Sequence, residues 1–276
     1  MLGVFRKKQE HVDKRWVMIA LVAFVVMLVV NALAGGTTLL GGTDTAAVSD
    51  SYPNLFAPAG LTFAIWGVIY LLLGAFFFRA FELWKPKKSA VPNGALNEVV
   101  QLFAASSVLN AVWLFAWQYH VVWLSVLVMA ALLVTLIYTH RLVAVAGYDW
   151  REYIMLRLPF AVYFGWITVA TIANVTAWLV SINWDGFGLS DGTWMVAVLL
   201  VGASIGLTVA LRRKDAAYLA VFVWAYAGIL FKHLADDGFN GAYPSTIAAL
   251  TILLAVFVTV TLRLAVEQPS LQQLKK

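Results

Sequence analysis

Residues 16–34 read WVMIALVAFVVMLVVNALA, an apolar run without a charged side chain that follows the basic residues Lys14 and Arg15. A helix needs about 20 mostly apolar residues to cross the hydrocarbon core of a bilayer. The run therefore predicts a membrane-spanning helix. Its basic flank and the small residues Ala32-Leu33-Ala34 also fit a cleaved signal peptide. Because the run is long enough to cover the whole bilayer, we favour a retained helix.

The composition extends this interpretation to the whole chain. The protein is 62% hydrophobic and 12% charged, with a mean hydropathy of +0.85, whereas soluble domains carry about 25% charged residues. It has no cysteine, which excludes disulfides, thiolate metal sites and cysteine nucleophiles. We predict an all-α fold, a polytopic transmembrane helical bundle of about eight helices. The remaining seven apolar runs are residues 59–81, 98–119, 121–141, 155–182, 193–211, 216–232 and 244–264.

Basic residues are confined to alternate segments between these runs. Every Lys and Arg except Lys232 lies in or beside a tail or the second, fourth or sixth connection. Basic residues of short loops stay on the cytoplasmic side, which predicts cytoplasmic termini and an integral protein of a bacterial plasma membrane. This rule explains the net charge of +5, so no nucleic-acid partner is expected. The other connections carry Asp44, Asp50, Asp185, Asp191, Asp236 and Asp237 instead.

Aromatic and amide side chains gather at similar depth on three of the predicted helices. Residues four apart share a helix face, and an asparagine in hydrocarbon must find a hydrogen-bond partner. The three stripes indicate either helix packing or a pocket with aromatic walls and polar anchors for a flat apolar ligand. They consist of Trp66 and Tyr70, of Asn110, Trp113 and Trp117, and of Trp166, Asn174 and Trp178.

The other polar residues form no catalytic motif. No predicted span holds the acid or acid pair of an ion relay, and the P-loop, Gly-x-Ser-x-Gly and His-Glu-x-x-His patterns are absent. His233, Asp236 and Asp237 could bind a metal but fit a solvated loop better, and His140 fits a polar residue at the inner boundary. The small residues of 202–206 predict a helix contact. No catalytic or metal-binding residue is therefore assigned.

Three motifs in these stripes resemble the TspO/translocator protein family, also called tryptophan-rich sensory proteins or peripheral-type benzodiazepine receptors. The resemblance covers residues 16–184, the five helices usual for that family, and the chain departs from it in three further helices, 193–266, and in the spacing of its prolines. The motifs are Pro53-Asn54-Leu55-Phe56-Ala57-Pro58 followed by Trp66-x-x-x-Tyr70-x-x-x-Gly74; Asn110-Ala111-Val112-Trp113; and Trp166, Asn174 and Trp178 after Pro159.

The resemblance implies a five-helix pocket for porphyrins, sterol-like lipids or similar flat apolar molecules. Porphyrin or haem would be a ligand, and no cofactor is required. The lipid bilayer and a small apolar ligand are the expected partners, and a homodimer is implied because family members often dimerise. Carried over residue by residue, the ligand-binding residues are Asn54 in a lid over the pocket and Trp66, Tyr70, Asn110, Trp113, Trp166 and Asn174 in its walls.

On this basis the chain comprises a cytoplasmic tail 1–15, a TspO-like five-helix membrane domain 16–184, three additional transmembrane helices 190–266 and a cytoplasmic tail 267–276. The expected function is a sensor or carrier of tetrapyrrole-like ligands. A secondary transporter or permease and a scaffold for another membrane protein are alternatives. An enzyme that degrades porphyrin in light is a third, although the sequence offers it no general acid, base or metal.

Overall fold

The computed structural model describes residues 12–85, 88–145 and 147–267, and within these residues it is helical and contains no strand. Eight segments are long and apolar enough to cross a membrane, which confirms the predicted number of spans. The predicted tails 1–15 and 267–276 lie almost wholly outside the described residues. The long helices are α1 (Lys14–Gly36), α3 (Ile65–Glu82), α4 (Asn93–Gln118), α5 (Val122–Val143), α7 (Leu158–Ser181), α8 (Asp191–Arg213), α9 (Ala216–Leu234) and α10 (Pro244–Glu267).

Short helical pieces lengthen two spans and structure the loops. The 3-10 turn η1 (Gly60–Ala64) leads directly into α3. A short helix, α6 (Trp150–Glu152), and a π-helical turn, η2 (Tyr153–Arg157), lead into α7. Two others lie between spans, α2 (Thr45–Asp50) and η3 (Gly186–Gly188).

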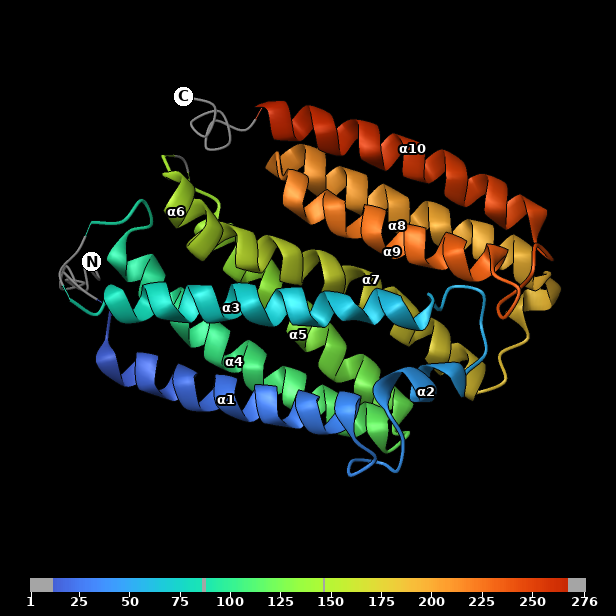
Figure 1. Cartoon of the computed structure of the whole chain (residues 1–276), viewed down its shortest axis with the longest axis horizontal. Coiled ribbons are helices and arrows are strands. Elements are labelled where there is room, and N and C mark those ends of the chain that lie inside the picture. Colours follow the sequence, from blue (N-terminus) through green and yellow to red (C-terminus); the bar gives the residue numbers. More distant parts are fainter. Residues whose placement is uncertain (1–11, 86–87, 146, 268–276) are drawn as a thin grey trace, which may run out of the picture.

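The helices lie side by side in two groups (Figure 1). Helices α1, α3, α4, α5 and α7 form one group, and α8, α9 and α10 form a second group that packs on α7 through α9. Helix α1 begins and α10 ends at the same end of the bundle, as an even number of spans requires. We call this the basic end, and the opposite end, which holds α2 and η3, the loop end.

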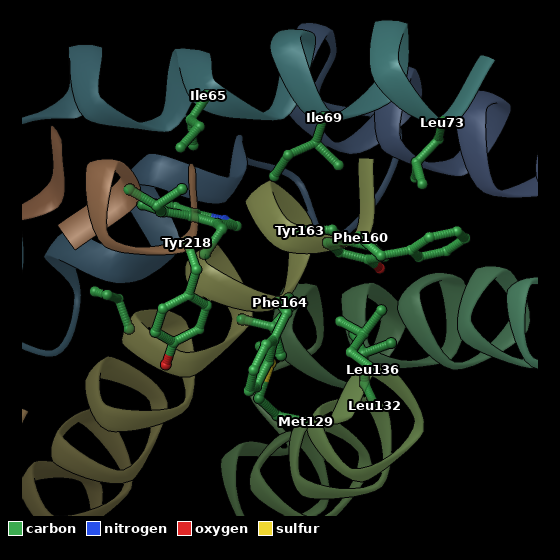
Figure 2. Packing of buried hydrophobic residues seen from close by; sticks show 14 of the residues in the cluster. Ile65, Ile69, Leu73, Met129, Leu132, Leu136, Phe160, Tyr163, Phe164 and Tyr218 are labelled. Carbon is green, nitrogen blue, oxygen red and sulfur yellow. The ribbon is translucent and has the colours of Figure 1, made fainter. Parts of the chain in front are cut away.

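Helix α7 forms the centre of the first group (Figure 2). Its aromatic side chains Phe160, Tyr163 and Phe164 are buried between apolar side chains of α3 and α5. Because lipid is as apolar as these side chains, close packing and hydrogen bonds stabilise such contacts more than removal from solvent does. The neighbouring side chains are Ile65, Ile69 and Leu73 of α3 and Met129, Leu132 and Leu136 of α5.

Glycines allow the second group to approach closely. A Cβ atom on Gly165 of α7 would lie 2.8 Å from the carbonyl oxygen of Tyr218 in α9. A Cβ on Gly202 of α8 would lie 2.6 Å from the hydroxyl of Tyr226, and one on Gly206 would lie 2.8 Å from the ring of Phe222. The helix contact predicted for residues 202–206 is thereby confirmed, with α9 as the partner.

Buried ion pairs tie helices together at the basic end. Arg79 at the end of α3 lies 3.0 Å from Glu152 of α6. The fully buried carboxylate of Asp215, which caps α9 by accepting from the backbone N–H of Tyr218, lies 3.0 Å from His140 and 3.4 Å from Arg157. Burial alone would raise the pKa of Asp215, but the hydrogen bond and charge of His140, with Arg157, bring the pKa below its usual value. His140 thus lies at the predicted boundary as a member of a buried pair.

The solvated-loop interpretation of His233 is wrong. Helix α9 continues two residues beyond the predicted run, to Leu234, and His233 within it is completely buried. Its Nε2 atom lies 3.0 Å from the carbonyl oxygen of Leu55. Within the described residues, no three His, Asp or Glu side chains are grouped to hold a metal ion.

Candidate functional site

The three predicted aromatic stripes meet between α3, α4 and α7. The ring of Trp66 lies 6.2 Å from the rings of both Trp113 and Trp166, stacked on the first at 29° and edge-on to the second at 84°. Tyr70, one turn along α3, stacks on Trp66 at 5.7 Å. Helical spacing explains the arrangement, because residues four apart turn to the same face.

A cavity of about 50 Å³ lies between these rings and residues 54–58. Its walls are mostly aromatic and aliphatic, with a few polar atoms. Five predicted site residues line it: Asn54, Trp66, Trp113, Trp166 and Asn174. We call it the aromatic cavity.

The two asparagines that line this cavity, the predicted lid residue Asn54 and the predicted wall residue Asn174, are already hydrogen-bonded to protein. The Asn174 side chain accepts from Trp113 Nε1 at 3.0 Å and donates to the Ser125 hydroxyl at 2.8 Å. The Asn54 side chain accepts from the backbone N–H groups of Phe56 at 3.0 Å and Ala57 at 2.9 Å. Asn54 therefore shapes the loop, and Asn174 fixes the orientation of Trp113.

Trp166 differs from these residues because its buried Nε1 atom has no hydrogen-bond partner among the residues that the structure describes. An unpaired buried donor costs about 1–3 kcal/mol. The donor belongs to a side chain that lines the cavity. The cavity lining thus includes a tryptophan whose N–H group is left unpaired by the described residues.

Asn110 lies behind the aromatic cavity. It is fully buried, accepts from Asn31 Nδ2 at 2.7 Å and donates to the Tyr163 hydroxyl at 3.1 Å. The Tyr70 hydroxyl donates to the same Asn31 side chain. The predicted residues Tyr70 and Asn110 are therefore linked through Asn31, which the sequence analysis did not single out.

A second cavity of about 270 Å³ lies between α1, α2 and α3. Asn31 and Tyr70 line it, and Phe63, Trp66 and Trp113 line both this cavity and the aromatic cavity. These three rings and Thr45, which also lines both cavities, separate the two spaces. Of the stacked pair in this partition, Trp66 is half-buried and Trp113 is buried.

Residues 50–59 cross the loop end beside the aromatic cavity, and we call them the strap. Helix α9 holds the strap at three points: Lys232 pairs with Asp50 at 3.0 Å, His233 lies 3.0 Å from the Leu55 carbonyl, and the Ala59 N–H donates to the Gly228 carbonyl at 3.2 Å. The predicted lid residue Asn54 lies in this strap. The last three helices thus contact the strap as well as α7.

The comparisons with known proteins gave one finding. A family model described as TSPO-like protein matches residues 16–263. The match extends through α8 and α9 into α10. It therefore includes most of the three helices for which the motifs of the first five helices gave no counterpart in the family. Neither a curated protein nor a solved structure matches the chain.

Proposed function

The chain belongs to the family of TSPO-like proteins and is an integral membrane protein, and from this premise we propose that it is a sensor or carrier that binds porphyrins or similar flat apolar ligands in the aromatic cavity. The observation that carries the proposal is the unpaired Nε1–H of Trp166 among aromatic walls. A buried donor without a partner is stabilised when a ligand supplies the acceptor.

The walls suit a planar apolar ligand. Aromatic rings attract other rings in stacked or edge-on arrangements, worth about 0.5–1.5 kcal/mol per pair beyond the area buried. Trp66 and Trp113 present stacked faces, and Trp166 stands edge-on to Trp66. A macrocycle inserted here would lie against ring faces while Trp166 Nε1 donates to its polar edge.

The size of the cavity requires a conformational change on binding. Ligand sites usually measure roughly 300–1,000 Å³, whereas the aromatic cavity measures about 50 Å³. Joined with the second cavity of about 270 Å³, it falls at the lower end of that range. We therefore assign Trp66 the role of a movable partition.

The ligand's ring system, and not its metal, would be recognised. Among the described residues that line the aromatic cavity there is no His, Met or Cys to coordinate iron. Haem and the metal-free macrocycle would thus be bound by the same contacts.

We further propose that the basic end faces the cytoplasm of a bacterial cell. The basic residues described there include Lys14, Arg79, Arg141, Arg212 and Lys214, whereas the loop end carries aspartates and Lys232. The positive-inside rule supports this orientation.

The test is a titration of the purified full chain in dodecyl maltoside with protoporphyrin IX, followed by tryptophan fluorescence. Trp166→Phe keeps the ring and removes the N–H group. Trp178→Phe is the matched control, because Trp178 lies on the same helix and lines neither the aromatic nor the second cavity.

We expect saturable quenching that Trp166→Phe weakens by roughly fivefold to tenfold, the value of one hydrogen bond of about 1–1.5 kcal/mol, and that Trp178→Phe leaves unchanged. Combining Trp166→Phe with Asn174→Ala should weaken it further, because Trp113 then loses its acceptor. Non-saturating quenching that is equal in all variants would mean that the stripes serve packing alone.

A further inference from the structure

A larger cavity, of about 420 Å³, lies at the loop end on the other side of the strap. Asn54 and Phe56 of the strap line both this space and the aromatic cavity. Its remaining walls come from the end of α7, the η3 loop, the start of α8 and the connection between α9 and α10. We call it the outer cavity. It has the size of a ligand site as it stands.

Besides Phe56, two pairs of aromatic side chains contribute to its walls. The rings of Trp184 and Trp194 lie 4.9 Å apart, and the Trp194 Nε1–H donates to the Gly186 carbonyl, which fixes the loop. The rings of Phe239 and Tyr243 lie 5.6 Å apart, and both pack against the buried ring of His233. Aromatic faces carry negative potential and attract cations, with Trp the strongest.

The charged residues in the lining are all acidic. Asp185 and Asp191 are both exposed at the rim, and no Lys or Arg is among the described residues that line the cavity. One Asp185 oxygen accepts from the Phe187 N–H at 3.0 Å. Lys232, the basic residue of the loop end, is paired with Asp50 at 3.0 Å. The positive end of the α8 dipole also lies here, and Asp191 in its first turn opposes it.

We propose that the outer cavity binds a lipophilic monocation, a quaternary or protonated amine carried on an apolar body. The aromatic faces and the two carboxylates both attract the positive head, and the aliphatic part of the lining takes the apolar body. The aliphatic residues are Leu55, Leu179, Val180, Leu189, Met195 and Val198. A ligand that bears carboxylates, such as a porphyrin with its acidic side chains, would be repelled. The proposal is thus independent of the function assigned to the aromatic cavity.

Calorimetric titration of the full chain in dodecyl maltoside with phenyltrimethylammonium tests the proposal, and benzenesulfonate is the probe of opposite charge. The variant Asp185→Asn/Asp191→Asn removes both lining charges while an Asn oxygen at position 185 can still accept from Phe187. Asp236→Asn/Asp237→Asn is the matched control, because it removes the same charge from the same end of the protein outside the cavity lining. A second variant, Trp184→Leu, removes one aromatic face.

We expect saturable binding of phenyltrimethylammonium, no binding of benzenesulfonate, and a loss of about fivefold in Asp185→Asn/Asp191→Asn, because each of the two exposed carboxylates contributes roughly 0.5 kcal/mol to the attraction of a cation. The control should change affinity by less than about twofold, because Asp236 and Asp237 are exposed and lie outside the cavity lining, where solvent and salt weaken their attraction for the ligand. Trp184→Leu should also weaken binding of phenyltrimethylammonium, because it removes one of the aromatic faces of the lining.

Three results would overturn the proposal: no saturable heat with the wild type, equal binding of benzenesulfonate, or equal losses in the lining and control variants. The last result would show diffuse attraction by the acidic loop end. Titrating Asp185→Asn/Asp191→Asn with protoporphyrin distinguishes the outer cavity from the aromatic cavity. The fluorescence quenching curve of this variant should match that of the wild type.

Discussion

Replacing Gly165 by alanine tests the contact that joins the last three helices to the first five. The added Cβ would lie 2.8 Å from the Tyr218 carbonyl oxygen and 3.0 Å from the Val221 Cβ, whereas ordinary van der Waals contact begins at 3.4 Å. The nearest atom belongs to the backbone of α9 and cannot swing aside as a long side chain can. Helices α7 and α9 must therefore separate by several tenths of an ångström.

Two opposing effects set the expected magnitude. Overpacking of a close-packed contact costs about 1–3 kcal/mol. Alanine in place of glycine inside a helix stabilises by up to about 1 kcal/mol. We expect Gly165→Ala to lower the free energy of unfolding by about 1–2 kcal/mol. Gly74→Ala makes the same change in the interior of α3, where no atom lies within 4 Å of the added Cβ, so it should stabilise the protein by up to about 1 kcal/mol.

The free energies can be measured by unfolding the detergent-solubilised protein with sodium dodecyl sulfate and following circular dichroism. The comparison of the two variants separates the steric effect from helix propensity, because the propensity gain is shared. If Gly165→Ala were as stable as Gly74→Ala, the close approach of α7 and α9 would be refuted, and with it the docking of the second helix group through α9.

Three further predictions concern the orientation in the membrane, the buried Asp215 and the binding of haem. Because the chain has no cysteine, Thr38→Cys and Lys88→Cys each introduce a single thiol, at opposite ends of the bundle. An impermeant maleimide applied to intact cells should label Thr38→Cys alone, and labelling of Lys88→Cys alone would mean that the orientation is reversed. Asp215→Asn removes a buried charge and should lower the free energy of unfolding by about 3 kcal/mol. Because the pKa of Asp215 in the folded protein lies below the usual 3.8, the wild type should be more stable than the variant above that pH, and the difference should vanish as the pH falls through the folded pKa. A difference in stability that persists in strong acid would contradict the ion pair. Haem and metal-free protoporphyrin should bind with affinities within about twofold, and a haem Soret shift typical of axial histidine or methionine would show that an iron ligand had been missed.

Local patterns predicted the spans and the aromatic stripes. Hydropathy over about 20 residues depends only on the run itself, so all eight spans could be found without knowledge of their neighbours. Helical spacing likewise predicted that Trp66, Trp113 and Trp166 lie on faces that can meet. The structure places the centre of the Trp66 ring 6.2 Å from the ring centres of both Trp113 and Trp166.

The partners of polar residues could not be predicted because they depend on which helices adjoin. Asn31 is the one polar residue of the run 16–34, and its need for a partner in hydrocarbon was the signal that could have identified it. Asp215 follows Arg212, Arg213 and Lys214 in sequence, yet it pairs with His140 and Arg157 of other helices. The sequence near Asp215 contains no pattern that predicts His140 and Arg157 as its partners.

The error at His233 had a different cause. The nearby acidic residues Asp236 and Asp237 are exposed, and the sequence interpretation extended their environment back to His233. The helix instead continues to Leu234, which turns His233 toward the strap. The exact end of a helix is the feature that sequence patterns define least well. The division of the chain into residues 16–184 and 190–266 stays a prediction.

The strap separates two cavities with one set of residues, and this has a thermodynamic consequence. Asn54 and Phe56 line both the aromatic and the outer cavity, so a ligand that displaces them from one side alters the wall of the other. Linkage requires such an effect to be reciprocal: the factor by which one ligand changes the affinity of a second equals the factor by which the second changes the first. If both proposed ligands bind, occupancy on one side of the strap would act as an effector for the other, and titrating either ligand at fixed concentrations of its counterpart would measure their coupling free energy.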